Sequence, residues 1–259
     1  MNVKQRKRQV KKQQRNSLKE EIQMIDLKCG DCLELMKDIP DESIDMILCD
    51  LPYGTTRNKW DSIISLDKLW EQYERIIKDN GVIALFSQMP FTAELVHSNL
   101  NLFKYEWIWE KDNGTGFLNA KKMPLKIHEN IEIFYKKLPM YNPQMRTGFK
   151  PYSVRQGRHS SNYGNYEEGH LTISGGERYP IDVIKYKKDS GFHPTQKPVA
   201  LLEYLIKTYT NENDLVLDNC MGSGSTGIAC VNTNRNFIGI ELDENCFNIA
   251  KERIEKEIR

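Results

Sequence analysis

Several features that would mark other classes of protein are missing from this sequence of 259 residues. No run of apolar residues is long enough to span a bilayer. The basic, polar N-terminus contains no apolar segment of the kind that a secretory signal needs. The sequence therefore predicts a protein that stays in the cytoplasm, with room for one α/β domain and one sizeable insertion.

Metal-binding and disulfide patterns are also scarce. Among the six cysteines, only Cys29 and Cys32 show C-x-x-C spacing, and neither a second cysteine pair nor a histidine pair accompanies them, as a zinc site would require. A thioredoxin-like context is missing too. We interpret the cysteines as free thiols in a reducing compartment.

The chain carries little excess charge, with a formal net charge of only +1. A nucleic-acid-binding protein of this composition needs a local basic surface. Residues 4–19 are rich in Lys, Arg and Gln, contain no acid and have too few apolar residues to pack a core. Residues 1–22 are therefore predicted to form a flexible basic arm, either a solvated tail or a phosphate-binding segment.

Short apolar segments alternate with amphipathic helical patterns along the chain. The predicted strands are residues 44–49, 82–86, 105–109, 131–135, 215–217 and 237–240, with 24–27 as a weaker candidate. The predicted helices are residues 66–78, stopped by Asn80-Gly81, then 199–209 and 246–258. Such alternation indicates a doubly wound, mostly parallel α/β sheet. Residues 141–190 lack this periodicity and are interpreted as an insertion outside the sheet.

A glycine-rich loop lies between a predicted strand and a predicted helix near the C-terminus. Gly222, Gly224 and Gly227 match G-x-G-x-x-G directly after the strand at 215–217. Glycines at such a place let the backbone approach a ligand closely. The next strand runs into Glu241, about 20 residues after Gly222, which is the sequence spacing typical of an acid that accepts hydrogen bonds from a ribose. These features together predict a nucleotide site rather than an ordinary tight turn.

Two common nucleotide sites do not fit this loop. No Lys-Ser/Thr pair follows the last glycine, which excludes a P-loop. An NAD-binding domain needs more strands after the loop than the rest of the chain supplies. The remaining strands must therefore come from upstream, in a rearranged order.

A second candidate site is Asp50-Leu51-Pro52-Tyr53, which follows the predicted strand at 44–49. The exocyclic amine of a nucleobase is a poor nucleophile because its lone pair is delocalised into the ring. The Asp50 carboxylate and the Leu51 carbonyl would localise that lone pair by accepting from the two N–H groups. Pro52 would hold the turn, and Tyr53 would stack on a base extruded from a duplex. Alone, the tetrapeptide also fits an ordinary turn with an Asp cap.

Together, these segments resemble the amino-methyltransferases of DNA, which carry a D/N/S-P-P-Y/F tetrapeptide and a D-P-F-x-G-S-G-T-T loop. Leu51 replaces the usual first proline, and Asn219 and Cys220 replace the Pro and Phe of the loop. The tetrapeptide precedes a complete H-P-T-Q-K-P match at residues 193–198, an order similar to that of the beta class. The resemblance implies a twisted seven-stranded methyltransferase sheet of permuted order, S-adenosylmethionine as cofactor and no metal.

The resemblance also implies a division of the chain and a set of cofactor contacts. Residues 1–22 are followed by a catalytic half at residues 23–140, a target-recognition insertion at 141–190 and a cofactor-binding half at 191–259. Asp31 is expected to contact the cofactor adenine, and Thr195 and Lys197 its methionine carboxylate end. The other expected cofactor contacts are Asp50, Asp218, Gly222, Ser223, Gly224 and Glu241.

The insertion occupies the position where this family carries its target-recognition region. Arginine reads guanine edges and lysine mainly meets phosphates. The candidate contacts with double-stranded DNA are Arg146, Arg155, Arg158, Arg178 and Lys187. The alternative is a polar insertion whose charges are simply solvated.

We therefore predict a site-specific DNA methyltransferase that transfers a methyl group from S-adenosylmethionine to N6 of a flipped adenine. Cytosine N4 is the alternative with the same chemistry, although such family members more often have Ser in place of Asp50. An RNA or protein-glutamine methyltransferase, an inactive DNA-binding regulator and an NAD dehydrogenase are further alternatives. Beta-class members often form homodimers, but the sequence shows no diagnostic interface, restriction partner, or choice between a bacterial and a phage source.

Overall fold

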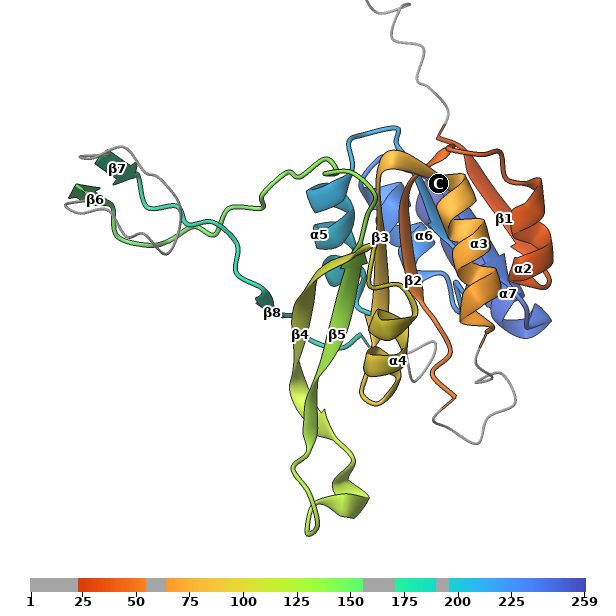
Figure 1. Cartoon of the computed structure of the whole chain (residues 1–259), viewed down its shortest axis with the longest axis horizontal. Helices are drawn as coiled ribbons and strands as arrows, with labels where there is room; N and C mark the ends of the chain where they lie inside the picture. The colour runs from red at the N-terminus through yellow and green to blue at the C-terminus, as the bar shows by residue number, and fades with distance from the viewer. Residues whose placement is uncertain (1–22, 55–63, 156–170, 190–195) are drawn as a thin grey trace, which may run out of the picture.

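The computed structural model describes residues 23–54, 64–155, 171–189 and 196–259 of the chain. Eight strands form one sheet in the order β1-β10-β9-β2-β3-β5-β4-β8 (Figure 1). Along the chain these strands are β1 (Ile25–Cys29), β2 (Ile44–Asp50), β3 (Ile77–Ser87), β4 (Phe103–Thr115), β5 (Lys126–Phe134), β8 (Val183–Lys185), β9 (Leu215–Asp218) and β10 (Asn236–Glu241).

The five strands from β1 to β3 run parallel to their neighbours, whereas β5 is antiparallel to both β3 and β4. This arrangement confirms the doubly wound, mostly parallel sheet and its rearranged order. The implied count of seven strands was wrong by one, because β8 adds a parallel strand beside β4. Residues 183–185 belong to the segment expected outside the sheet, so that expectation was wrong for them. These residues pair with β4 because its outer edge would otherwise present unpaired backbone N–H and C=O groups.

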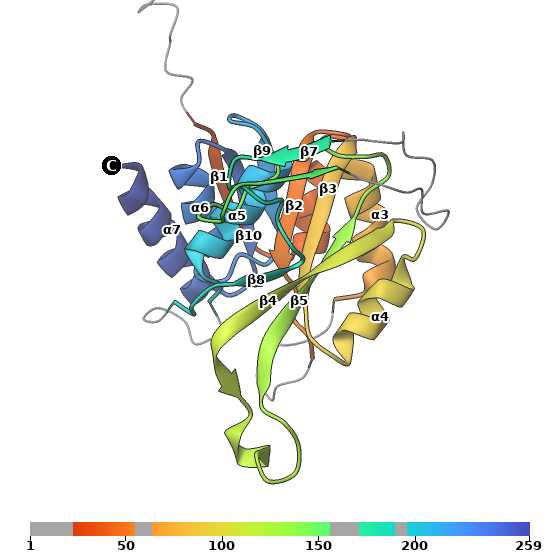
Figure 2. The same ribbon diagram turned by 90° about the vertical axis from the view of Figure 1, so that its left-hand side faces the viewer.

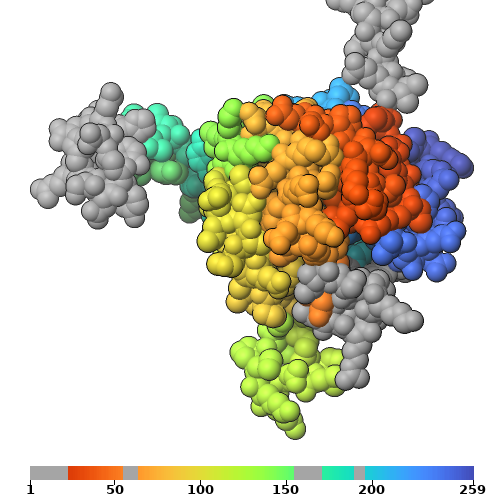
Figure 3. All heavy atoms as spheres, turned by 45° about the vertical axis from the view of Figure 1, so that its right-hand side comes forward, coloured from red at the N-terminus to blue at the C-terminus, as the bar shows by residue number. Residues whose placement is uncertain are grey.

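Two parts of the chain project from the sheet and its helices. The rest of the described insertion contains a separate two-stranded sheet of β6 (Tyr152–Arg155) and β7 (Leu171–Ser174), which lies away from the main body (Figure 1). The hairpin of β4 and β5 continues beyond the body in two further views (Figures 2 and 3). A short 3-10 helix, η2 (Phe117–Asn119), lies in the connection at its tip. No helix in the described segments has the length and apolar character of a membrane span.

Helices cover both faces of the sheet, and each face has its own hydrophobic core. One face packs against α5 (Val199–Tyr209), α6 (Ser225–Asn232) and α7 (Glu244–Ile258), and the other against α2 (Cys32–Leu35), α3 (Leu66–Ile76) and α4 (Phe91–Ser98). A further 3-10 turn, η1 (Met36–Asp38), follows α2.

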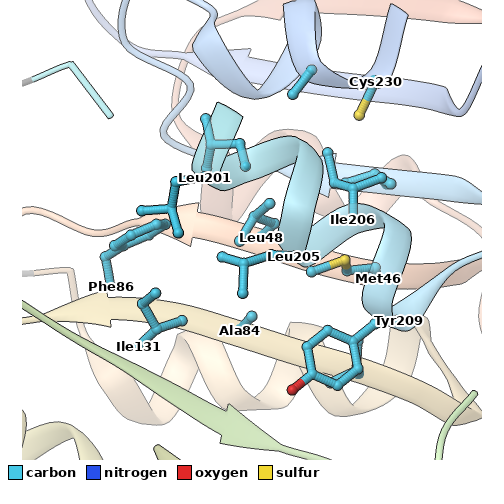
Figure 4. Close-up of a cluster of buried hydrophobic side chains, with 14 of the residues drawn as sticks. Met46, Leu48, Ala84, Phe86, Ile131, Leu201, Leu205, Ile206, Tyr209 and Cys230 are labelled. Carbon is cyan, nitrogen blue, oxygen red and sulfur yellow. The ribbon is translucent and has the colours of Figure 1, made fainter. Parts of the chain in front are cut away.

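The side chains of β2 alternate between these two cores because successive residues of a strand point to opposite faces. Met46 and Leu48 lie in the core beneath α5 (Figure 4). Ile47 and Cys49 lie in the opposite core with the buried residues of α3. All four side chains are at most 1% exposed. Strand β2 is therefore buried on both faces, and its last residue, Asp50, lies where the carboxyl ends of the central strands leave the sheet.

The helix predicted at residues 66–78 was two residues too long. Helix α3 ends at Ile76, β3 begins at Ile77, and Asn80-Gly81 lies inside the strand. The register between β2 and β3 is irregular at this point, and Lys78 Nζ donates to Asp45 Oδ1 of β2 at 2.6 Å. Pairing with β2 therefore overrides the local helix-stop signal.

Candidate active site

The carboxyl ends of the parallel strands bring the predicted catalytic and cofactor carboxylates to one edge of the sheet. Strands β2 and β9 are neighbours, with Ile47 opposite Leu217, so the chain leaves both strands side by side. Asp50 ends β2, and Asp218 ends β9. On the other side of β9, Cys29 of β1 pairs with Glu241 of β10. Ligands of open α/β sheets bind in the crevice at this edge.

A chain of alternating charges surrounds Asp50. Lys197 Nζ donates to Asp50 Oδ2 and lies 3.2 Å from Glu129 Oε2. The other oxygen of Glu129 accepts a hydrogen bond from Lys111 Nζ. The side chain of Lys197 is only 9% exposed, compared with 30% for Asp50. The four groups therefore form a largely buried ion-pair network, with the Asp50 carboxylate as its most exposed member.

Burial and the neighbouring charges shift the pKa values of Lys197, Glu129 and Lys111 in different directions. Burial alone would lower the pKa of Lys197, but the nearby carboxylates of Asp50 and Glu129 raise it above the ordinary lysine value. Burial raises the pKa of Glu129, and the two lysines outweigh that effect and bring it below the usual glutamate value. Desolvation lowers the pKa of Lys111, which Glu129 partly offsets. A permanent cation thus stands beside Asp50.

The remaining residues of the tetrapeptide are arranged around the same carboxylate. Tyr53 donates its hydroxyl to Asp50 Oδ1 at 2.7 Å, and its ring stacks on Phe91 of α4 with centroids 5.3 Å apart. Burial and the charge of Asp50 raise the pKa of the Tyr53 phenol, which keeps it a donor. The Leu51 side chain is buried, at 3% exposure. Only its backbone carbonyl is therefore suited to contact a substrate amine, which explains why leucine is compatible with this position.

The glycine loop is organised by the acids at its two sides. Asp218 is buried and accepts from Cys220 N at 3.1 Å and from Thr226 Oγ1 at 2.6 Å. Its burial raises its pKa to about 7. Glu241 accepts from Gly222 N at 2.8 Å. Both carboxylates shape the loop directly, and Glu241 keeps further lone pairs for a ligand at the sheet edge.

The three glycines of the loop differ in what a side chain at their positions would meet. Gly222 has φ +51° and faces open space where a Cβ would stand, so the backbone is accessible to a ligand there. A Cβ on Gly224 would lie 2.9 Å from Ala250 Cβ, and one on Gly227 would lie 2.4 Å from Ile254 Cδ1. Gly224 and Gly227 are therefore required for packing against α7, and only Gly222 of the three faces open space.

Asp31 and the H-P-T-Q-K-P segment have mixed outcomes. Asp31 follows β1 at the same edge and caps α2 by accepting from Leu33 N at 2.8 Å. Thr195 lies outside the described residues. Lys197, expected at the methionine end of the cofactor, is paired with Asp50 and Glu129, so its cofactor contact stays a prediction.

Sequence reasoning missed Lys111, Glu129 and Arg253. Lys111 and Glu129 lie on β4 and β5, and nothing local marks them as partners of Asp50. Arg253 of α7 donates to Ser223 Oγ at 3.0 Å and also to its carbonyl, which fixes the middle of the loop. The available signal was alternation: Lys111 continues the buried face of Trp107 and Trp109, and Glu129 that of Ile131 and Ile133. A charge on a buried face requires a partner.

Among the described DNA-contact candidates, Arg146 and Arg178 lie in the projecting part of the insertion, whereas Lys187 lies just after β8 of the main sheet. Arg146 and Arg178 are joined by two backbone hydrogen bonds of 2.8 and 2.9 Å, and both guanidinium groups lie 5.3 Å from the Phe149 ring. Arg178 also donates to Ser174 Oγ and to the Lys150 carbonyl, so it stabilises this small sheet. Lys187 is exposed. The side chain of Arg155 and all of Arg158 lie outside the described part of the chain.

Comparison with known proteins identifies the family. Residues 44–252 match the model of the N6_N4_Mtase family, which is described as DNA methylase. The chain therefore belongs to this DNA methylase family. It is 29% identical over 246 residues to the type II methyltransferase M.HpaI of Haemophilus parainfluenzae, a match that covers 88% of this chain and 74% of the relative.

Two further similarities agree with that assignment. The chain is 28% identical over 247 residues to the DNA adenine methyltransferase YhdJ of Escherichia coli strain K12, covering 87% of this chain and 81% of the relative. The structure resembles that of the M1.HpyAVI-SAM complex with a TM-score of 0.61 at 26% identity, covering 89% of this chain and 100% of the other.

Proposed function

We propose that this DNA methylase is a site-specific adenine-N6 methyltransferase that uses S-adenosylmethionine. The observation that carries the proposal is the adjacency of β2 and β9, which sets Asp50 of the catalytic tetrapeptide beside the cofactor loop that follows Asp218. Methyl transfer needs a nucleophile and a methyl donor in such proximity, because orientation supplies much of the rate enhancement.

The residues around the glycine loop suit an adenosine group and a charged methionine end. The open space at Gly222 admits the ligand, and Glu241 borders it through the Gly222 amide. Asp31, beyond the end of β1, is the expected acceptor for the adenine amine. Bound there, S-adenosylmethionine would supply an electrophilic methyl group.

The tetrapeptide would act on the target amine. Asp50 and the Leu51 carbonyl each accept one N–H of the extruded base, which localises the nitrogen lone pair and directs it toward the cofactor side of the edge. With the methyl donor bound, the amine would gain a methyl group, the donor would leave as the neutral thioether, and one proton would leave the nitrogen. Asp50 is the carboxylate that is positioned to accept that proton, while Tyr53 stacks on the base and Lys197 holds the carboxylate in place.

Two observations support adenine over cytosine as the target. The first tetrapeptide position is Asp50 rather than the serine that is more frequent in cytosine-N4 enzymes. YhdJ, which is similar over most of both chains, is named a DNA adenine methyltransferase.

The insertion would recognise the DNA sequence. Its small sheet projects from the body (Figure 1), and Arg146, Arg178 and Lys187 are the described candidates for contact with bases and phosphates. The organisms of M.HpaI and YhdJ are bacteria, which supports action on DNA in a bacterial cytoplasm. A role in restriction–modification is a further part of the proposal, because the similar protein M.HpaI is named a type II methyltransferase. A homodimer stays a prediction from the family resemblance.

Nucleoside mass spectrometry tests the proposal directly. Unmethylated genomic DNA is incubated with the protein and S-adenosylmethionine labelled on its methyl group, with Asp50→Asn as the test variant. Asp67→Asn, at an exposed position of α3, is the matched control. We expect label in N6-methyladenine from the wild type and the control but not from Asp50→Asn. Label in N4-methylcytosine would overturn the base assignment, and unlabelled DNA would overturn the reaction.

A further inference from the structure

The hairpin of β4 and β5 reaches far beyond the edge that carries the active site. Ser87, the last residue of β3, pairs with Asn130 of β5. The residues of β5 before Asn130 thus extend past the carboxyl end of β3 by about 13 Å, at about 3.3 Å per residue. We call residues 113–127 the arm; it projects from the body beyond this edge (Figure 3).

The tip of the arm is ordered rather than an open loop. Thr115 pairs with Lys126 across the hairpin, and the turn of η2 is closed by hydrogen bonds from Asn119 N to Gly116 O and from Lys122 N to Asn119 O, at 2.9 and 2.8 Å. A built turn at the end of two strands presents its side chains in fixed directions.

Those side chains are apolar and exposed. Phe117 is 76% exposed and Leu118 is 84% exposed, although neither belongs to either core. The only charged side chains of the arm are Lys121, Lys122 and Lys126, and the arm contains no acid. All three lysines are exposed. An apolar tip flanked by unneutralised lysines is complementary to a duplex, which offers phosphates outside and an apolar base stack inside.

The base of the arm is bound to the catalytic carboxylate. Lys111 of β4 and Glu129 of β5 flank the arm in the chain and form an ion pair with each other. Glu129 also contacts Lys197, which pairs with Asp50. The contacts at its base therefore connect the hairpin to the site around Asp50, and its tip extends from there beyond the sheet.

We propose that the arm is a second DNA-binding element, distinct from the insertion. Phe117 and Leu118 enter the base stack close to the target nucleotide and take over the stacking that its neighbours had with the base before it was extruded. Lys121 and Lys122 bind the flanking phosphates. This proposal rests on the proposed function, since it assumes the same DNA substrate.

The test compares two double variants with matched controls. Phe117→Ala/Leu118→Ala removes the apolar tip, and Leu138→Ala, at an exposed position after β5 with 81% exposure, is its control. Lys121→Gln/Lys122→Gln removes two charges, and Lys251→Gln/Lys256→Gln on the exposed side of α7 is its control. The dissociation constant for duplex genomic fragments is measured by fluorescence anisotropy at several salt concentrations, together with S-adenosylmethionine affinity, kcat/KM and oligomeric state.

We expect the tip variant to bind duplex DNA about tenfold more weakly, the loss typical of removing a stacked aromatic, with unchanged affinity for S-adenosylmethionine. The lysine variant should reduce the salt-dependence slope by about 0.9 for each phosphate that it no longer neutralises. Wild-type affinity and slope in both variants would overturn the proposal. A change of oligomeric state without a change in DNA affinity would overturn it in favour of a contact between two copies. A wild type that binds but does not methylate DNA would contradict the proposed function alone.

Discussion

Lys197 is the residue whose replacement tests the active-site network most sharply. It is the one cation, among the described residues, that contacts both Asp50 and Glu129. Lys197→Met keeps much of the side-chain volume and removes the charge. Glu129 then retains Lys111 alone, and Asp50 retains the Tyr53 hydroxyl.

The size of the effect follows from the burial of the network. Removing one partner of a buried ion pair costs about 3–5 kcal/mol, since it leaves an uncompensated charge. Lys197 is 9% exposed and Glu129 is 14% exposed, but Asp50 is 30% exposed and is partly solvated. We therefore expect the free energy of unfolding to fall by about 3 kcal/mol at neutral pH, at the lower end of that range.

The loss should depend on pH with a defined sign. The lysines hold the pKa of Glu129 below its usual value, so Glu129 contributes stability above its unfolded pKa that is lost as the pH falls through its folded value. Lys197→Met removes part of this contribution. The difference from the wild type should therefore be largest near pH 7–8 and shrink below about pH 4.5.

Urea unfolding followed by circular dichroism at pH 4 and pH 8 measures this difference. Lys207→Met is the control, because Lys207 forms an ion pair with Glu203 on α5 at 3.4 Å with both side chains partly exposed, and such a pair contributes at most about 0.5 kcal/mol. An equally small loss in both variants at pH 8 would refute a stabilising role for the network. Methyl transfer by Lys197→Met should also fall well below that of Lys207→Met.

Three further predictions concern the loop, the core and the tetrapeptide. Gly222→Ala should weaken S-adenosylmethionine binding about tenfold in calorimetry. Gly227→Ala would overlap Ile254 and should instead lower the free energy of unfolding by about 1–3 kcal/mol. Equal losses of binding in the two variants would contradict this distinction. Burial raises the pKa of Glu132 to about 7, so the stability of the wild type should fall as the pH rises from about 4.5 to 7. In urea unfolding at pH 8, Glu132→Gln should be more stable than the wild type by up to about 3 kcal/mol. Parallel pH profiles of the two proteins would exclude this. Tyr53→Phe keeps the ring but not the hydroxyl bond to Asp50, so kcat should fall more than DNA affinity, and a pure affinity loss would contradict that role.

Much of the site was predictable from the sequence because its parts are local. Strand, turn and functional residue lie within about ten residues of one another in both 44–53 and 215–224. The apolar run determines where the strand is buried, and the polar residue after it must then emerge at the sheet edge. The strands and the positions of the glycine loop and the tetrapeptide at the sheet edge were predictable for that reason, whereas the roles of their residues stay predictions.

Long-range pairing decided features that no local pattern showed. Strand β1 is the first strand of the predicted catalytic half, but it pairs with β10, which brings Asp31 close to the end of β10 at Glu241. Strand β8, from the insertion, pairs with the edge of β4. The end of α3 was set by pairing of β3 with β2 rather than by the Asn-Gly signal.

The same division applies to the electrostatics and to the glycines. The sequence by itself determined that Asp50 and Lys197 are present, and family order suggested separate tasks for them. Only the tertiary structure decided that Lys197 contacts Asp50 across 147 positions of sequence, with Glu129 from β5 on its other side. It also decided that Gly227 is needed for Ile254 whereas Gly222 faces open space. A charge or a small residue acquires its role from the groups that the fold brings against it, and those groups are distant in the chain.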